Sequence, residues 1–257
     1  MRARYDLAKI IAIEAGDLQN NFCGKELNTS IKSSTVDIVT EIDFAVQSTI
    51  INRIVSRFPD DGILAEEKYA KETKDEWTWI IDPLDGTTNY SHGFPLYCVS
   101  IGLYKENRGY YGVIYLPCLK ELFEAHRGEG ATLNGKPINC SSIEEIDKAM
   151  VATGFPYDVN PLAEDNVPQF KNFLMEAQAV RRFGSAAIAL AYIACGRLDG
   201  LWEMKLRLWD MAAGVLMIQE AGGEVTGYNN EPFDMFSRKV VASNGHIHQK
   251  MIEILRR

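Results

Sequence analysis

One short stretch constrains the fold of this chain most, because an apolar run ends there in two carboxylates, a glycine and two hydroxyls. The segment is Trp79-Ile80-Ile81-Asp82-Pro83-Leu84-Asp85-Gly86-Thr87-Thr88-Asn89. Tryptophan and β-branched residues up to Ile81 predict a buried strand. Pro83 cannot donate to a sheet ladder, so we expect the strand to end there, with both acids just past its tip. In open α/β sheets this tip is where ligands bind.

The composition of this segment is that of a metal and phosphate site. Asp82 and Asp85 are three residues apart, so a tight turn can direct both carboxylates at one point, with a backbone carbonyl between them. Hard oxygen ligands without a nearby histidine or cysteine favour Mg²⁺ over Zn²⁺. The amides of Gly86, Thr87 and Thr88 open what could be a helical turn, which suits phosphate. The structural alternative is an ordinary Asp-Gly turn.

Two further acidic elements argue against that alternative. Residues 209–223 have small and apolar side chains at helical spacing and end in two glycines, with Asp210 where the helix begins. Asp210 on its own is explained as well by helix capping. Residues 63–67 again place carboxylates, Glu66 and Glu67, after an apolar run, which alone would predict a solvated loop. The combination of all three elements is what indicates a functional site.

Length and charge set limits on the fold and on the partners. The chain has 257 residues, of which 46% are hydrophobic, so it can bury the core of one large or two closely packed domains. A net charge of −8 without a block of basic residues argues against nucleic acid or an anionic membrane as a main partner. The five scattered cysteines predict reduced, mostly buried thiols. No apolar stretch is long enough to span a membrane, and the expected location is the cytoplasm.

Hydrophobic periodicity predicts two differently organised halves. In the first, we expect helices near 4–23 and 42–57, strands around 62–65, 77–82, 96–104, 109–117 and 120–126, and a hairpin at Asn134-Gly135. After Pro161 the pattern alternates, with helices 165–177, 185–195, 210–221 and 246–256 and strands 179–183, 198–203, 224–228 and 239–243. The best candidate boundary is the stretch 158–165. Acids lie on both sides of it, which predicts one site shared between the halves.

The three acidic elements together resemble the signature motifs of the inositol monophosphatase family. The two longest matches are W-I-I-D-P-L-D-G-T-T-N-Y and W-D-M-A-A-G-V-L-M-I-Q-E-A-G-G. Residues 32–43 and 65–67 match two further family segments, with Ala65 in the place of a glycine. The resemblance runs almost end to end. It implies an α/β (α+β) fold, a layered αβαβα sandwich over residues 1–257 that can be divided into subdomains 1–158 and 159–257, and commonly a homodimer.

The family consists of Mg²⁺-dependent, lithium-sensitive phosphatases related to fructose-1,6-bisphosphatase, and this chemistry has a physical reason. A phosphate monoester dianion repels nucleophiles, and neither motif contains a lysine or arginine, so metal ions must supply the positive charge. By resemblance, Glu66, Asp82 and the Leu84 carbonyl hold a first Mg²⁺, whose bound water is the nucleophile. Glu66 and the Thr87 hydroxyl orient that water.

The resemblance assigns a second Mg²⁺ to Asp82, Asp85 and Asp210, at the leaving oxygen. Asp43 has two open interpretations: it helps with a third, weaker ion through water, or it is a favourable charge at a helix N-terminus. The substrate contacts that the resemblance implies are Asp85, Gly86, Thr87, Thr88, Gly184, Ser185, Ala186, Glu203 and Asp210.

Three functions remain open at this point. The leading one is hydrolysis of inositol monophosphate, because Glu203 can accept hydrogen bonds from a polyol and would repel a second phosphate. A rival is a phosphatase for fructose 1,6-bisphosphate or an adenosine bisphosphate, for which the candidate basic residues are Arg181, Arg182, Lys205 and Arg207. The third is a regulatory protein associated with RNA machinery, which the acidic composition disfavours.

Overall fold

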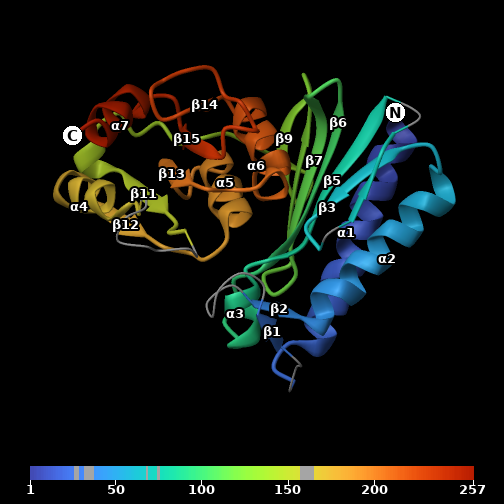
Figure 1. Ribbon diagram of the computed structural model, residues 1–257. Helices are drawn as coiled ribbons and strands as arrows, with labels where there is room; N and C mark the ends of the chain where they lie inside the picture. Colours follow the sequence, from blue (N-terminus) through green and yellow to red (C-terminus); the bar gives the residue numbers. More distant parts are fainter. Residues whose placement is uncertain (26–28, 32–37, 68, 74–75, 157–164) are drawn as a thin grey trace.

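The chain folds into alternating layers of helix and sheet (Figure 1). The computed structural model describes residues 1–25, 29–31, 38–67, 69–73, 76–156 and 165–257. Two helices cover one face of an eight-stranded sheet, two lie between this sheet and a five-stranded sheet, and two cover the outer face of the second sheet. In that order the helices are α1 (Arg2–Phe22), α2 (Glu41–Arg57), α5 (Ala186–Ala194), α6 (Leu208–Glu220), α4 (Val167–Glu176) and α7 (His248–Leu255). The predicted αβαβα sandwich is confirmed.

The eight-stranded sheet has the order β10-β9-β8-β7-β6-β5-β3-β4 and is antiparallel except for the pair β3 and β5. Its strands are β3 (Gly62–Ala65), β4 (Tyr69–Lys71), β5 (Trp77–Asp85), β6 (Cys98–Lys105), β7 (Arg108–Leu116), β8 (Glu121–His126), β9 (Gly130–Leu133) and β10 (Lys136–Ile138). One face packs on α1 and α2 and the other on α6, so the central strands are buried almost without interruption. This burial explains why their sequences are apolar runs rather than alternating patterns.

The five-stranded sheet has the order β12-β11-β13-β15-β14. Its strands are β11 (Met150–Thr153), β12 (Ala179–Arg181), β13 (Gly200–Met204), β14 (Glu224–Thr226) and β15 (Lys239–Ser243). The shorter elements are β1 (Thr29–Ile31), β2 (Ile38–Thr40), α3 (Thr87–Ser91) and a 3₁₀ turn over Ile146–Lys148. Four short strands, β1, β2, β4 and β11, were not predicted, because three or four residues carry too little periodic pattern. The candidate boundary 158–165 lies almost wholly outside the described residues.

One prediction about the signature segment was wrong. The strand does not end at Pro83: β5 continues to Asp85. Its register against β6 shifts, since Asp82 pairs with Ser100 and Asp85 pairs with Cys98, so three steps on β5 oppose two on β6. This is a β-bulge, which accommodates a proline that has no N–H to donate. The two acids therefore flank a bulge at the end of β5 instead of following its tip.

Two paired glycines let helix α6 approach the eight-stranded sheet closely. Gly102 of β6 lies opposite Gly112 of β7. A Cβ at Gly102 would lie 2.8 Å from the Ala212 Cβ, and one at Gly112 would lie 2.8 Å from the Ala213 carbonyl oxygen. Because the first turn of α6 carries Asp210, this contact sets how close Asp210 comes to the acids of β5.

Two smaller findings complete the description. All five cysteines are free thiols, as predicted, but the prediction that most are buried was wrong, since Cys98 is buried, three others are partly buried and Cys118 is exposed. Within the described part of the chain, none of the helices has both the length and the apolar character needed to cross a membrane.

Candidate functional site

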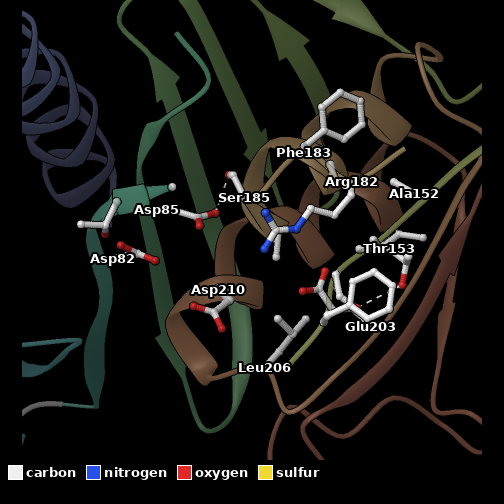
Figure 2. A pocket seen from close by; sticks show the side chains of 18 of the residues that line it. Asp82, Asp85, Ala152, Thr153, Arg182, Phe183, Ser185, Glu203, Leu206 and Asp210 are labelled. Carbon is white, nitrogen blue, oxygen red and sulfur yellow. Dashed lines mark hydrogen bonds between the residues drawn. The ribbon is translucent and has the colours of Figure 1, made fainter. Parts of the chain in front are cut away.

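A pocket brings together acidic side chains from four separate segments (Figure 2). They are Glu66 after β3, Asp82 and Asp85 on β5, Glu203 on β13 and Asp210 on α6. Further parts of the wall come from the end of β11 and the loop after it, and from the loop between β12 and α5 with the first turn of α5. Acids that the sequence places as far apart as residues 66 and 210 thus face one space, with one of them contributed by the second sheet.

Asp82 lies at the most crowded point of the pocket. Its side chain is buried, and Oδ1 accepts a hydrogen bond from the Leu84 amide at 3.0 Å. Burial raises the pKa of Asp82 well above its usual range, and the charges of Glu66, Asp85 and Asp210 raise it further. A hydrogen bond between the Asp82 and Glu66 carboxyl groups adds to the effect. The pocket therefore concentrates more negative charge than it can stabilise without protons or cations.

Asp85 ties the first sheet to helix α5. Its Oδ2 accepts hydrogen bonds from Ser185 Oγ at 2.6 Å and from the Ala187 amide at 2.8 Å. Ser185 is the N-cap of α5, and its hydroxyl also accepts from the Ile188 amide. Burial raises the pKa of Asp85 to about 6 in spite of these bonds. The start of α5 thus fixes the orientation of one pocket acid.

Asp210 is both a helix cap and a wall of the pocket. It is the third residue of α6, where its Oδ2 accepts the Arg207 amide at 2.7 Å. Burial raises its pKa well above the usual range, and Asp85, Glu66 and Glu203 add to that shift. The hydrogen bond confirms that Asp210 caps helix α6. Capping does not exclude a functional role, because Asp210 also lines the pocket.

Thr87 connects the pocket to Asp43, which lies outside the lining. The Thr87 hydroxyl is 3.1 Å from the Leu84 carbonyl oxygen and 3.2 Å from Asp43 Oδ1, so it can donate to either. The other Asp43 oxygen accepts from the Thr40 amide at 2.7 Å and from the Thr40 hydroxyl at 2.5 Å, at the start of α2. Asp43 is thus a helix N-terminal residue that also reaches Thr87.

The predicted substrate contacts fall into two groups. Gly86, Gly184 and Ala186 line the pocket, whereas Thr88 lies on α3 outside the lining. Gly86 has a φ of 96°, and a Cβ there would lie 2.8 Å from the Leu96 carbonyl oxygen. Only glycine fits this turn, which leads from the bulge of β5 into α3.

Glu203 faces the acids from the second sheet. Burial raises its pKa to about 8, and Asp85 raises it while Arg182 lowers it. A Cβ on Gly154 would lie 1.8 Å from Glu203 Oε1, so a side chain at position 154 would displace the Glu203 carboxyl group. Figure 2 shows the Arg182 side chain reaching into the same pocket. Of the four basic candidates, Arg182 lines the pocket; Arg181, Lys205 and Arg207 do not.

Asn89 is a further functional candidate. It belongs to the signature segment 79–89, but no role was predicted for it from the sequence. Its Nδ2 donates to the Leu96 and Phe183 carbonyl oxygens, both at 2.7 Å. Phe183 and Gly184 form part of the pocket wall, so Asn89 fixes that wall to α3. An asparagine between two threonines and a tyrosine was the available signal, but Phe183, the partner that forms part of the pocket wall, lies 94 positions further along the chain.

The donor chemistry of the pocket suits a hard cation. The described lining residues include five carboxylates and Leu84 but no histidine or cysteine, which favours Mg²⁺ over Zn²⁺. In the described part of the chain, no three acidic, histidine or cysteine side chains already stand in the arrangement of a formed metal site. The carboxylates would therefore draw together on an ion, which relieves the repulsion that raises their pKa values.

These raised pKa values predict how the stability of the metal-free protein depends on pH. The folded pKa of Glu203 is about 8 against a usual 4.5, so the folded state binds this proton more tightly than the unfolded state. Stability from this group is present below the usual pKa and is lost as pH rises towards 8. We expect wild-type protein in chelator to lose melting temperature relative to Glu203→Gln between pH about 5 and pH about 8. An equal gap at both pH values would show that the pKa of Glu203 is ordinary.

Comparisons with known proteins agree on one family. The family model described as "Inositol monophosphatase family" matches residues 2–257. An inositol-1-monophosphatase of Synechocystis sp. is 42% identical over 251 residues, covering 97% of this chain and 88% of that protein. Among solved structures, the extragenic suppressor protein suhB of Bartonella henselae has a TM-score of 0.94 at 36% identity, covering 99% of both chains. The inositol monophosphatase of Anabaena has a TM-score of 0.89 at 38% identity, covering 99% of this chain and 96% of that one.

Proposed function

Because the chain belongs to the inositol monophosphatase family, we propose that it hydrolyses a small phosphate monoester, inositol monophosphate above others, with Mg²⁺ held in the acidic pocket. The observation that carries this proposal is the convergence of Glu66, Asp82, Asp85 and Asp210 on one space, with raised pKa values for the three aspartates. Buried acids that repel one another are costly to a fold, and a cation-dependent reaction gives them a use.

We assign two ion positions within this pocket. Glu66, Asp82 and the Leu84 carbonyl would hold one Mg²⁺, and Asp82, Asp85 and Asp210 the other. When bound, such ions lower the pKa of water and neutralise the charge that develops on the phosphoryl and leaving oxygens. The register shift at Pro83 supports this assignment, since Asp82, Leu84 and Asp85 at this end of β5 all line the pocket.

The residues around the ions have their own tasks. We propose that the Thr87 hydroxyl donates a hydrogen bond to Asp43, which leaves the Thr87 oxygen free to accept a hydrogen bond from the attacking water, while Glu66 accepts the second hydrogen bond of that water. Asp43 Oδ1 lies 3.2 Å from the Thr87 hydroxyl, and the competing acceptor at 3.1 Å, the Leu84 carbonyl oxygen, is the one that we propose binds the first ion. We also propose that Asp43 helps to hold a third, weaker ion through a water molecule. The substrate contacts we propose are Asp85, the amides of Gly86, Thr87 and Thr88, the wall of Gly184, Ser185 and Ala186, and the side chains of Glu203 and Asp210.

Glu203 is the residue we expect to recognise the alcohol part of the substrate. It lies across the pocket from the metal acids, and its carboxyl group can hydrogen-bond polyol hydroxyls in either protonation state. We expect Glu203→Gln to raise KM for inositol 1-phosphate several-fold and to leave KM for glycerol 2-phosphate nearly unchanged. Steady-state kinetics at saturating Mg²⁺ measure both. Equal effects on the two esters would show that Glu203 does not contact the inositol ring.

One observation favours a second candidate, a bisphosphatase. Arg182 lines the pocket close enough to Glu203 to lower its pKa, so a distal phosphate would meet a guanidinium as well as a carboxyl group. This would weaken the repulsion on which the preference for a monophosphate rests. The inositol phosphate proposal nevertheless agrees better with the Synechocystis and Anabaena relatives, which are named for that activity.

A panel of phosphate esters tests the proposed function directly. The panel contains inositol 1-phosphate, fructose 1,6-bisphosphate, an adenosine 3′,5′-bisphosphate and glycerol 2-phosphate, each assayed with Mg²⁺ and with chelator. We expect Mg²⁺-dependent release of phosphate with the highest kcat/KM for inositol 1-phosphate. A higher kcat/KM for fructose 1,6-bisphosphate would support the second candidate. No hydrolysis of any ester would favour the regulatory alternative. The structurally similar protein of Bartonella henselae is named an extragenic suppressor protein rather than a phosphatase.

Two family properties are proposed on membership alone. They are inhibition by lithium and assembly as a homodimer. Assays with increasing Li⁺ and analytical ultracentrifugation would measure them.

A further inference from the structure

Two buried glutamines lie in the helical layer behind the acidic pocket. Gln19 in the last turn of α1 is 0% exposed, and Gln47 in α2 is 6% exposed. Apart from Asp43 in the first turn of α2, the other buried side chains of both helices are apolar. An amide in such a layer is costly unless its polar atoms find partners, so the identity of those partners is informative.

Gln19 holds the bulge of β5. Its Nε2 donates to the Pro83 carbonyl oxygen at 2.7 Å, across 64 positions of sequence. Pro83 stands between Asp82 and Leu84, both of which line the pocket. The backbone of Gln19 is tied to α3, the helix that follows β5, because the Gln19 carbonyl accepts the Tyr90 hydroxyl at 2.7 Å. Gln19 Oε1 has no hydrogen-bond partner in the described structure, so the amide is present at a cost that a leucine would avoid.

Gln47 holds the segment that carries Glu66. Its Oε1 accepts the Glu67 amide at 2.9 Å, and its Nε2 donates to the Glu67 carbonyl oxygen at 3.3 Å. Both backbone polar groups of the residue next to Glu66 are therefore engaged by one side chain. The two glutamines act on neighbouring strands, since β3 and β5 are paired in parallel.

We propose that Gln19 and Gln47 are positioning residues that hold the backbone of Asp82 and Glu66 so that these two carboxyl groups face each other. The inference rests on the proposed function, because it concerns the acids assigned to the first ion. Two carboxylates that repel each other drift apart unless their backbones are fixed. A fixed backbone leaves the cation less ordering to do and raises its affinity. Neither glutamine touches the pocket, so neither is a catalytic residue.

Calorimetric titration of Mg²⁺ into the full-length protein, without substrate, tests the proposal. Gln19→Leu and Gln47→Leu keep the side-chain bulk and remove the amide. We expect each to weaken the apparent Mg²⁺ affinity by about 10- to 100-fold, as loss of an outer-shell hydrogen bond typically does. In kinetics we expect kcat at low Mg²⁺ to fall and to recover when Mg²⁺ is raised, with KM for inositol 1-phosphate unchanged at saturation.

Asn244→Leu is the matched control. Asn244 is also a buried amide, 3% exposed, and donates to the Ser141 hydroxyl at 2.9 Å and to the Ile143 carbonyl oxygen at 2.8 Å, away from the pocket. It should lower the melting temperature and leave Mg²⁺ affinity unchanged. A Mg²⁺ affinity within about twofold of wild type in both glutamine variants would mean that the glutamines only support the fold.

Two shorter variants cover the case in which a leucine variant does not fold. Gln19→Asn and Gln47→Asn keep the amide but are one methylene too short to reach their partners, and wild-type affinity in both would overturn the proposal. The panel of esters distinguishes failure of the positioning proposal from failure of the proposed phosphatase function. Wild-type protein that hydrolyses no ester refutes the function, whereas active wild type with unaffected variants refutes only the positioning role.

Discussion

We expect Asp82→Asn and Asp210→Asn each to lower kcat by at least about a hundredfold while leaving the fold intact, because each removes a charge proposed to hold a catalytic cation. Asparagine at position 210 can still accept the Arg207 amide, so the cap of α6 is kept and the loss of activity reports the charge alone. Steady-state kinetics at saturating Mg²⁺ give kcat, and circular dichroism confirms folding.

Both substitutions have an internal control. The pKa of each aspartate is raised by burial and by the neighbouring acids, so replacing it should stabilise the metal-free protein at neutral pH. A higher melting temperature in chelator, combined with lower activity in Mg²⁺, would be hard to explain by damage to the fold. If Asp210→Asn instead kept wild-type turnover, helix capping would be the full account of this residue.

Removing Mg²⁺ should abolish activity and almost abolish the binding of inorganic phosphate. Five acidic side chains line the pocket, and Arg182 is the sole lysine or arginine among the described lining residues. On a chain of net charge −8, the bare pocket should repel a phosphate dianion. Titration calorimetry with phosphate, in excess chelator and then in excess Mg²⁺, measures the difference. Tight phosphate binding in chelator would contradict the proposal that cations form the anion site.

The sequence predicted the family, the layered fold and most long elements, for a common physical reason. Helices such as α1 and α6 and strands such as β5 to β8 carry many apolar residues in a regular pattern. This pattern can be recognised in a single sequence without structural information. Short strands lack it. β11 has four residues, yet it forms the middle of three parallel neighbours in the second sheet, which no local pattern indicates.

The error at Pro83 shows how tertiary contacts can change a local rule. A proline normally ends a strand because it lacks an N–H, and the prediction followed that rule. Here a bulge absorbs the missing donor, and the Pro83 carbonyl is satisfied by Gln19 from a helix 64 positions earlier. Neither the bulge nor its partner can be seen in the segment itself.

The same limit applies to the candidate site. Motif matching placed Glu66, Asp82, Asp85 and Asp210 in one group, and the structure brings all four to one pocket. The sequence motifs could not distinguish Arg182 from the other three basic candidates, because whether a basic residue lines the pocket depends on the path of the loop before α5. The roles proposed for these residues remain predictions for the experiments above.

The glycine pair beneath α6 has a consequence for how this enzyme could change. Gly102 and Gly112 leave room for the helix by lacking a methyl group each, and the depth of that seat sets the position of Asp210 relative to Asp82. A side chain added at either glycine would lift the helix without altering any proposed ligand. Substitutions at Gly102 or Gly112 could therefore change the ion preference of the site, in evolution or in the laboratory. A sequence comparison would show such substitutions only as changes in packing.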